Sequence, residues 1–148
     1  MVVAAATLVM GQVAVSSASA APAETSRLQQ KIDRYLEKHS EARQVGVNKV
    51  QIPGGTLTVA DPGTTFSAAA ISCSSGWLCI QDGYGDRYDY YYCGYYDFWG
   101  IGDGVFNNNQ TSGTVARFYN QNGSLRWTNT AKATGTASWT PVYHIRPC

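Results

Sequence analysis

Four cysteines, all between residue 73 and residue 148, constrain this sequence more than any other feature. Cys73 and Cys79 are close neighbours, Cys93 follows them, and Cys148 is the last residue. An even number of cysteines in a small domain is typical of a disulfide-bonded protein folded in an oxidising compartment. The spacing alone does not select among the three pairings. We expect Cys73 to pair with Cys79, and Cys93 with Cys148.

Zinc binding and catalysis fit these residues less well. Zinc sites usually separate paired cysteines by two to four residues, and the spacer between Cys73 and Cys79 is wider. The two histidines, His39 and His144, fall in different segments, and no serine lies in a Gly-x-Ser-x-Gly nucleophile motif. We therefore expect a binding protein and not an enzyme, with no catalytic or cofactor-binding residue.

The first twenty residues have the pattern of an export signal. Residues 1–15 carry no charge and are mostly apolar, and Ala18-Ser19-Ala20 is a small-residue cleavage pattern, although no lysine or arginine precedes the apolar run. The run is shorter than the roughly twenty apolar residues that a membrane-spanning helix needs. We expect a signal peptide over 1–20, no membrane span, and a secreted, extracellular protein.

The charge of the chain argues against a nucleic-acid partner. Binding to a phosphate backbone calls for a clustered basic face, whereas the formal net charge is only +1. Between Asp82 and Asp103 the segment is acidic, with Arg87 as its one basic residue. We expect this segment to repel anionic polymers.

The segment 21–65 carries the one strong helical pattern. On a helix over 24–44, apolar side chains at i, i+4, i+7 and i+8 form one stripe. A hairpin over 45–52 and 56–59 follows. One helix and two strands are too little to fold alone, so this segment is predicted to be a propeptide-like leader, a cap on the main domain, or a linker that orders on docking. The stripe consists of Leu28, Ile32, Tyr35 and Leu36.

From about residue 66 the pattern is all β. Short aromatic runs alternate with turn signals such as Asp82-Gly83 and Asn122-Gly123, without helical periodicity. This pattern predicts a compact sandwich over 66–148. The expected strands cover 77–81, 87–93, 113–120, 125–129 and 141–146.

The aromatic residues of this domain have two interpretations. Tyr88, Tyr90 and Tyr92 alternate with their neighbours and so fall on one face of a predicted strand. An outward row of aromatic residues, joined by Trp99 and Trp127, could stack on sugar rings or anchor a protein partner. Core packing is the alternative interpretation, because small β domains are rich in aromatic residues.

Four motifs of the β region form a recognisable set: Cys73-x-x-Gly76-x-Leu78-Cys79, Asp82-Gly83-Tyr84-Gly85-x-Arg87, Cys93-Gly94, and Asn107 to Ser112. Taken together, these motifs resemble the family of secreted actinobacterial peptidase inhibitors with a βγ-crystallin-like fold, whose type member inhibits a metalloproteinase. The resemblance implies a mainly β, βγ-crystallin-like double Greek-key sandwich with an N-terminal helix and hairpin appendage, and we expect a monomer.

The resemblance also implies a calcium site. In calcium-binding relatives a loop of the form Asn/Asp-Asn/Asp-x-x-Ser/Thr-Ser closes each motif, and Asn107-Asn108-x-x-Thr111-Ser112 fits this form. Amide, hydroxyl and carbonyl oxygens are hard ligands that suit calcium. We expect one site of modest affinity, formed by Asn107, Asn108, Asn109 and Thr111. The alternative is that the asparagines are ordinary turn residues.

Two function hypotheses follow from these features. By resemblance, the protein inhibits an extracellular metalloproteinase through a rigid exposed loop, for which 94–104 and 129–141 are the candidate surfaces. The alternative is an extracellular module that binds carbohydrate or a cell-envelope polymer through aromatic side chains such as Trp99 and Trp127, without inhibitory activity.

Overall fold

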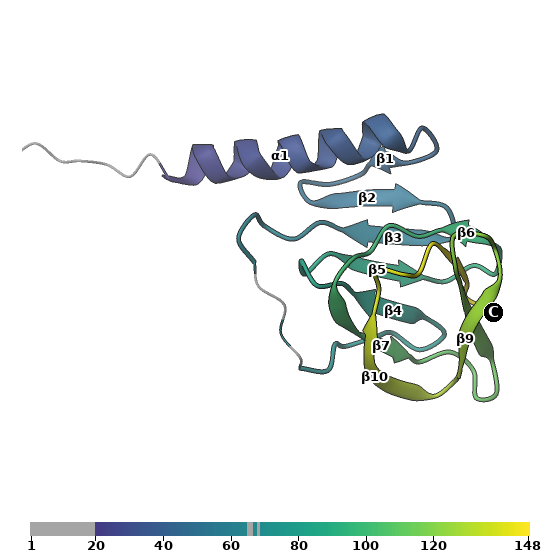
Figure 1. Ribbon diagram of the computed structural model, residues 1–148. Coiled ribbons are helices and arrows are strands. Elements are labelled where there is room, and N and C mark those ends of the chain that lie inside the picture. The colour runs from purple at the N-terminus through teal and green to yellow at the C-terminus, as the bar shows by residue number, and fades with distance from the viewer. Residues whose placement is uncertain (1–19, 65–66, 68) are drawn as a thin grey trace, which may run out of the picture.

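The computed structural model describes residues 20–64, 67 and 69–148, which form two antiparallel sheets and one helix (Figure 1). The predicted signal peptide over 1–20 lies outside the described residues except for Ala20, where the helix begins. None of the described helical residues forms a segment long and apolar enough to cross a membrane. The elements are α1 (Ala20–Lys38), β1 (Arg43–Gln44), β2 (Lys49–Ile52), β3 (Gly55–Thr58), β4 (Leu78–Gln81), β5 (Arg87–Tyr90), β6 (Tyr96–Asp97), β7 (Asp103–Asn108), β8 (Val115–Tyr119), β9 (Leu125–Thr130), β10 (Ala133–Ser138) and β11 (His144–Arg146).

The strand order is that of two Greek-key motifs that exchange one strand. The larger sheet runs β1-β2-β3-β5-β4-β7-β10 and the smaller runs β6-β11-β8-β9. The first motif, β4 to β7, sends its third strand β6 into the smaller sheet. The second motif, β8 to β11, sends its third strand β10 into the larger one. The predicted mainly β, double Greek-key sandwich is therefore confirmed.

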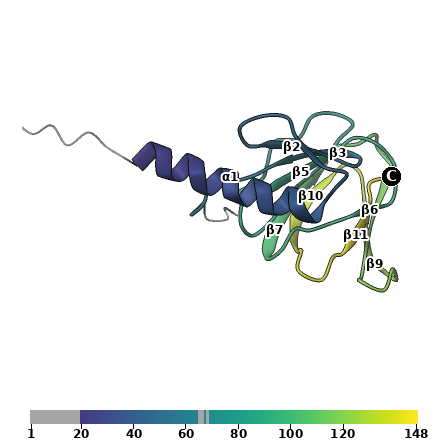
Figure 2. The ribbon, with the colours of Figure 1, turned by 90° about the horizontal axis from the view of Figure 1, so that it is seen from above.

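The hairpin β2–β3 is joined to the sandwich by strand pairing. β3 pairs with β5 along Gly55–Thr58, so the larger sheet continues without a break into the N-terminal segment. The helix α1 lies beyond β2 at this end of the sheet, and its N-terminal part extends away from the sandwich (Figure 2). Leu28 and Ile32 of the predicted apolar stripe are buried in the same cluster as Val50 and Leu57.

Several predicted boundaries are wrong. The helix ends at Lys38 and not at residue 44, because the chain turns through His39 and Ala42 into β1. The hairpin's first strand begins at Lys49, since the backbone N–H of Val45 donates to the Lys49 carbonyl and closes a tight turn. The strand predicted over 87–93 ends at Tyr90.

Four strands were not predicted: the two-residue strands β1 and β6, and the longer β7 and β10, which pair with each other over their full length. β10 has the sequence ATGTAS, in which no residue is both large and apolar. β7 ends in asparagines that resemble a turn. β7 and β10 form because pairing with neighbouring strands stabilises the extended backbone, although their own residues show little local preference for a strand.

Both predicted disulfides, Cys73–Cys79 and Cys93–Cys148, are present. The first joins cysteines that are 6 residues apart, and the second connects the loop between β5 and β6 to Cys148. Between the sheets, Trp139 and Phe118 are fully buried. The ring of Trp127 stacks on Phe118 at 3.9 Å between centroids.

Candidate functional site

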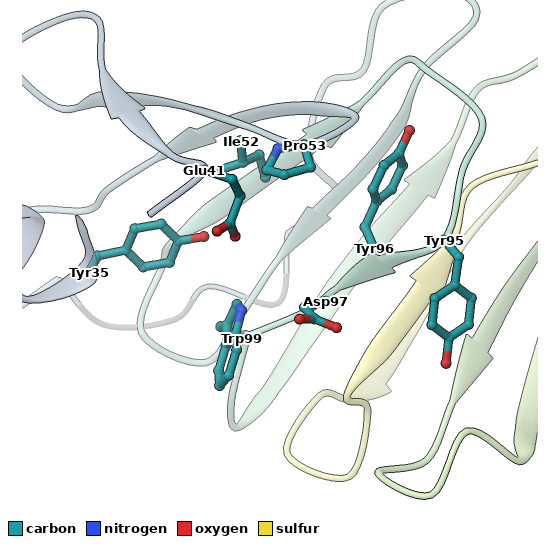
Figure 3. A pocket seen from close by; sticks show the side chains of 8 residues that line it. All are labelled: Tyr35, Glu41, Ile52, Pro53, Tyr95, Tyr96, Asp97 and Trp99. Carbon is teal, nitrogen blue, oxygen red and sulfur yellow. The ribbon is translucent and has the colours of Figure 1, made fainter. Parts of the chain in front are cut away.

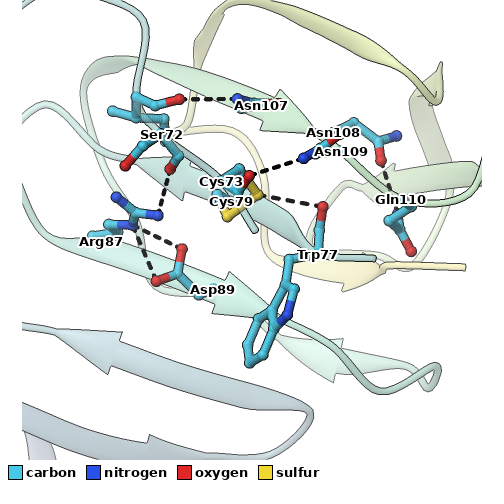
Figure 4. Close-up of a disulfide and its surroundings, with 11 residues drawn as sticks. Ser72, Cys73, Trp77, Cys79, Arg87, Asp89, Asn107, Asn108, Asn109 and Gln110 are labelled. Atoms are coloured by element: carbon cyan, nitrogen blue, oxygen red, sulfur yellow. Dashed lines mark hydrogen bonds and ion pairs between the residues drawn. A yellow bond between two sulfur atoms is a disulfide. The ribbon is translucent and has the colours of Figure 1, made fainter. Parts of the chain in front are cut away.

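The predicted calcium-binding loop begins at the end of β7, beside the first disulfide (Figure 4). The side-chain amide of Asn107 donates to the Ile71 carbonyl, and that of Asn109 donates to the Cys73 carbonyl, both at 2.9 Å. Asn107 and Asn109 thus hold the segment before β4 against β7. These hydrogen bonds give the two asparagines a long-range structural role, which differs from the local turn role of the alternative interpretation.

Asn108 points the other way and is fully buried. Its side-chain amide donates to Asn129 Oδ1 at 2.9 Å, and its own Oδ1 accepts from Gln110 Nε2 at 3.0 Å. Gln110 Nε2 also donates to the Pro147 carbonyl at 2.7 Å. This buried network ties the end of β7 to β9 and to the C-terminus, so the side-chain amide of Asn108 already has partners within the protein.

Thr111, the last predicted ligand, is exposed. Within the described part of the chain no group of three or more His, Cys, Asp or Glu side chains could hold a metal ion. The predicted site uses amide and hydroxyl oxygens, which such a grouping does not cover. Calcium binding at this loop stays a prediction.

The most exposed aromatic group belongs to a loop that we call the tyrosine loop, residues 91–95. Tyr91, Tyr92 and Tyr95 are each about half exposed or more. The sequence placed Tyr92 on the same face as Tyr88 and Tyr90, but only the latter two are buried, because the strand ends between Tyr90 and Tyr92.

The backbone of the tyrosine loop is fixed from three directions. The N–H groups of Tyr91 and Tyr92 both donate to the Gly54 carbonyl of the hairpin turn, at 2.9 and 3.1 Å. The Tyr96 hydroxyl donates to the Cys93 carbonyl at 2.9 Å. The disulfide to Cys148 then anchors the middle of the loop covalently.

Glycine is required where the hairpin turn meets this loop. Gly54 has φ of 81°, which favours glycine, and a Cβ at this position would overlap the ring of Tyr96. A Cβ on Gly94 would overlap the same ring. The hairpin turn and the loop therefore pack backbone against ring with no room for a side chain.

A second candidate site is a small hollow of about 250 Å³ next to the tyrosine loop, which we call the aromatic cleft (Figure 3). Its walls come from the end of α1, the hairpin and the segment around β6. The hydroxyl of Tyr35 points toward the carboxylate of Glu41, while Tyr95 and Tyr96 project in different directions from adjacent positions of the chain. The lining residues are Tyr35, Glu41, Ile52, Pro53, Tyr95, Tyr96, Asp97 and Trp99.

Two of the rings that line the cleft, Tyr35 and Trp99, are joined through the ring of His39. The His39 ring lies 4.2 Å from that of Tyr35 and 4.5 Å from that of Trp99, between centroids. Burial lowers the pKa of His39, and burial together with the charge of Glu41 raises the pKa of Tyr35. At neutral pH both side chains are therefore uncharged.

The two predicted ligand-contact tryptophans differ in their surroundings. Trp99 is 48% exposed and lines the aromatic cleft. Trp127 is half-buried and contacts Phe106, Phe118 and Trp139. The contacts of Trp127 belong to the core between the sheets, whereas Trp99 offers a surface to a ligand.

A buried carboxylate organises the β4–β5 turn. Asp82 is 1% exposed, and its Oδ1 accepts hydrogen bonds from the backbone N–H groups of Tyr84 and Asp86 at 2.9 and 3.0 Å. Its Oδ2 accepts from the backbone N–H of Ile101 at 3.3 Å. Burial, with a further contribution from the charge of Asp86, raises the pKa of Asp82 to about 6.

Comparisons of the chain with protein-family models, with curated proteins and with solved structures find no match. Sequence reasoning identified Trp99 but neither the cleft nor the anchoring of the tyrosine loop. Both depend on contacts between the hairpin and the first Greek key, for which the sequence carries no local signal.

Proposed function

We propose that this protein is a secreted inhibitor of an extracellular peptidase, of the metalloproteinase-inhibitor type, and that the tyrosine loop enters the cleft of its target. The observation that carries the proposal is the combination of a fixed backbone with exposed aromatic side chains in residues 91–95. The predicted candidate surface over 94–104 overlaps the end of this loop.

Rigidity is what an inhibitory loop needs. A loop that is already ordered loses little conformational entropy on binding, so more of the contact energy appears as affinity. Three hydrogen bonds to the backbone of the tyrosine loop and the Cys93–Cys148 disulfide fix this loop before any partner binds. Because the anchors are covalent or intramolecular, the loop also resists the distortion that cleavage by the target would require.

The side chains of the loop suit a protein partner. Tyrosine combines a large contact area with a hydroxyl that can hydrogen-bond, and it is enriched among the residues that dominate protein–protein binding energy. Trp77 packs on Tyr91 at 5.0 Å and Tyr91 packs edge-on against Tyr92 at 5.2 Å, between ring centroids. These contacts support the exposed rings from behind.

The test is a titration of a panel of purified extracellular endopeptidases, zinc metalloproteinases among them, with the disulfide-intact protein. Stoichiometric loss of activity is expected for at least one metalloproteinase. Full residual activity across the panel at a large molar excess would contradict the proposal.

Two matched variants locate the surface. Tyr92→Ala removes a side chain that is 65% exposed in the loop, and Tyr84→Ala removes one that is 59% exposed at the opposite end of β5. We expect Tyr92→Ala to raise the inhibition constant about tenfold or more, as for a dominant interface residue. Tyr84→Ala should leave it unchanged. Equal effects of the two substitutions would place the inhibitory surface elsewhere.

A further inference from the structure

The aromatic cleft has a charge and shape that point to a particular kind of ligand. Its lining includes two carboxylates, Glu41 and Asp97, and no lysine or arginine. Glu41 arrives from the segment after α1 and Asp97 from β6, so the two acidic groups come from different parts of the fold (Figure 3). A cavity of about 250 Å³ admits one small group and not an extended polymer.

Neither carboxylate is neutralised by a permanent cation. Among the described residues, Glu41 is paired only with His39, at 3.8 Å, and Asp97 only with His144, at 2.8 Å. His39 is buried and its lowered pKa keeps it neutral above the acidic range. Both carboxylate side chains are at least half exposed, so their free oxygens remain available to a ligand.

The rings beside the carboxylates add attraction for the same kind of ligand. Trp99 is half-exposed and backed by His39, which orders its ring. The face of a tryptophan or tyrosine ring attracts cations, and tryptophan does so most strongly. A positive group placed between Glu41 and Asp97 would lie close to Trp99 and to the Tyr35 ring.

An additional polar atom lies behind this cleft. The Tyr90 hydroxyl is the one buried side-chain polar atom of the described residues that has no hydrogen-bond partner. Its ring is stacked on that of Tyr96, at 6.0 Å between centroids. Besides burial, the groups that raise its pKa are Tyr35, Tyr96 and Asp97, all of which line the cleft. Tyr90 therefore packs against a residue that lines the cleft, and its own side chain is buried and outside the lining.

We propose that the aromatic cleft binds an alkylammonium group, such as a lysine side chain of a peptide or a free primary amine. An ammonium group carries three N–H donors and no acceptor, which matches the two carboxylates and the phenolic oxygen of Tyr35 that line the cleft. A sugar ring would also require several hydrogen-bond donors from the protein, and few of the residues that line the cleft carry one. The inference does not depend on peptidase inhibition, because small amines test it directly.

The experiment follows the indole N–H signals of the four tryptophans by NMR while n-butylamine is added to the full protein. A Trp99→Phe variant assigns the signal of Trp99. We expect that signal to shift saturably with butylamine and not with n-butanol, its neutral counterpart. Equal shifts with butanol would overturn the proposal. A parallel titration uses Nα-acetyl-lysine methylamide, which keeps the side-chain ammonium group. Tighter binding of this compound than of butylamine would indicate a lysine side chain of a peptide, and the reverse would indicate a free amine.

Isosteric variants test the charge. Glu41→Gln with Asp97→Asn removes both charges with little change of shape at half-exposed positions, and should weaken butylamine binding at least tenfold. Glu37→Gln, on the exposed face of α1 outside the cleft, is the matched control and should bind as the parent does. Unchanged affinity in the double variant would overturn the proposal, as would shifts with N-acetylglucosamine but none with amines. That second result would favour the carbohydrate-binding alternative.

Discussion

Removing the two disulfides separately should cost very different amounts of stability. The proteins to compare are Cys73→Ala with Cys79→Ala and, separately, Cys93→Ala with Cys148→Ala. The paired cysteines are 6 residues apart in the first case and 55 in the second. Because a cross-link restricts the unfolded chain more when it closes a longer loop, the chain-entropy relation gives about 2 and about 4 kcal/mol, respectively.

The assay is unfolding in urea, followed by far-ultraviolet circular dichroism. Loss of the long cross-link should lower the free energy of unfolding by about 2 kcal/mol more than loss of the short one. It should also increase the m-value, because the unfolded state then exposes more surface. If the variant without the long cross-link is unfolded in water, the same comparison is made in a stabilising osmolyte.

The m-value separates the entropic mechanism from local packing. Cys79 is buried and Cys93 is exposed, so alanine at position 79 also removes core contacts, which narrows the difference in stability. The loss of these core contacts in the folded state does not change the compactness of the unfolded chain. A larger stability loss for the short loop, together with an unchanged m-value for the long one, would refute the reasoning.

Two further predictions concern Asp82 and calcium. The folded-state pKa of Asp82, about 6, lies above its ordinary value of 3.8, so protonation favours the folded state. This stabilising contribution is complete below pH 3.8 and is lost as the pH rises through 6. It amounts to about 3 kcal/mol. Relative to Asp82→Asn, the parent should therefore lose about this much stability between pH 4 and pH 7, and parallel stability curves in urea would contradict this. Calcium should raise the melting temperature, Thr111→Ala should abolish that rise, and identical melting curves with calcium and with chelator would rule out the predicted site.

The sequence predicted the parts of the fold that rest on local periodicity. Leu28 and Ile32 repeat at helical spacing and are buried as expected. The end of the helix was misplaced because polar residues after Lys38 are compatible with a helix, and only the turn at His39 decides otherwise. β10 escaped detection because its small side chains pack against β7 without an apolar alternation.

The candidate site was predictable only in fragments. Tyr35, Glu41 and Trp99 come from segments that meet because β3 pairs with β5, and no local pattern predicts that pairing. The sequence placed Tyr92 on the same strand face as the buried Tyr88 and Tyr90. The strand β5 ends before Tyr92 because the N–H groups of Tyr91 and Tyr92 both donate to the Gly54 carbonyl, which is distant in the sequence. The cysteine pairing was chosen correctly, although the spacing alone permitted two others.

The pairing of β3 with β5 also bears on maturation of the protein. If a processing peptidase released the N-terminal segment after export, β5 would become a bare sheet edge, open to association with other chains. The same cut would remove Tyr35, Glu41 and the Gly54 carbonyl. A trimmed form would thus lack one wall of the cleft and the support of residues 91 and 92, so both proposed surfaces require that the N-terminal segment stays attached.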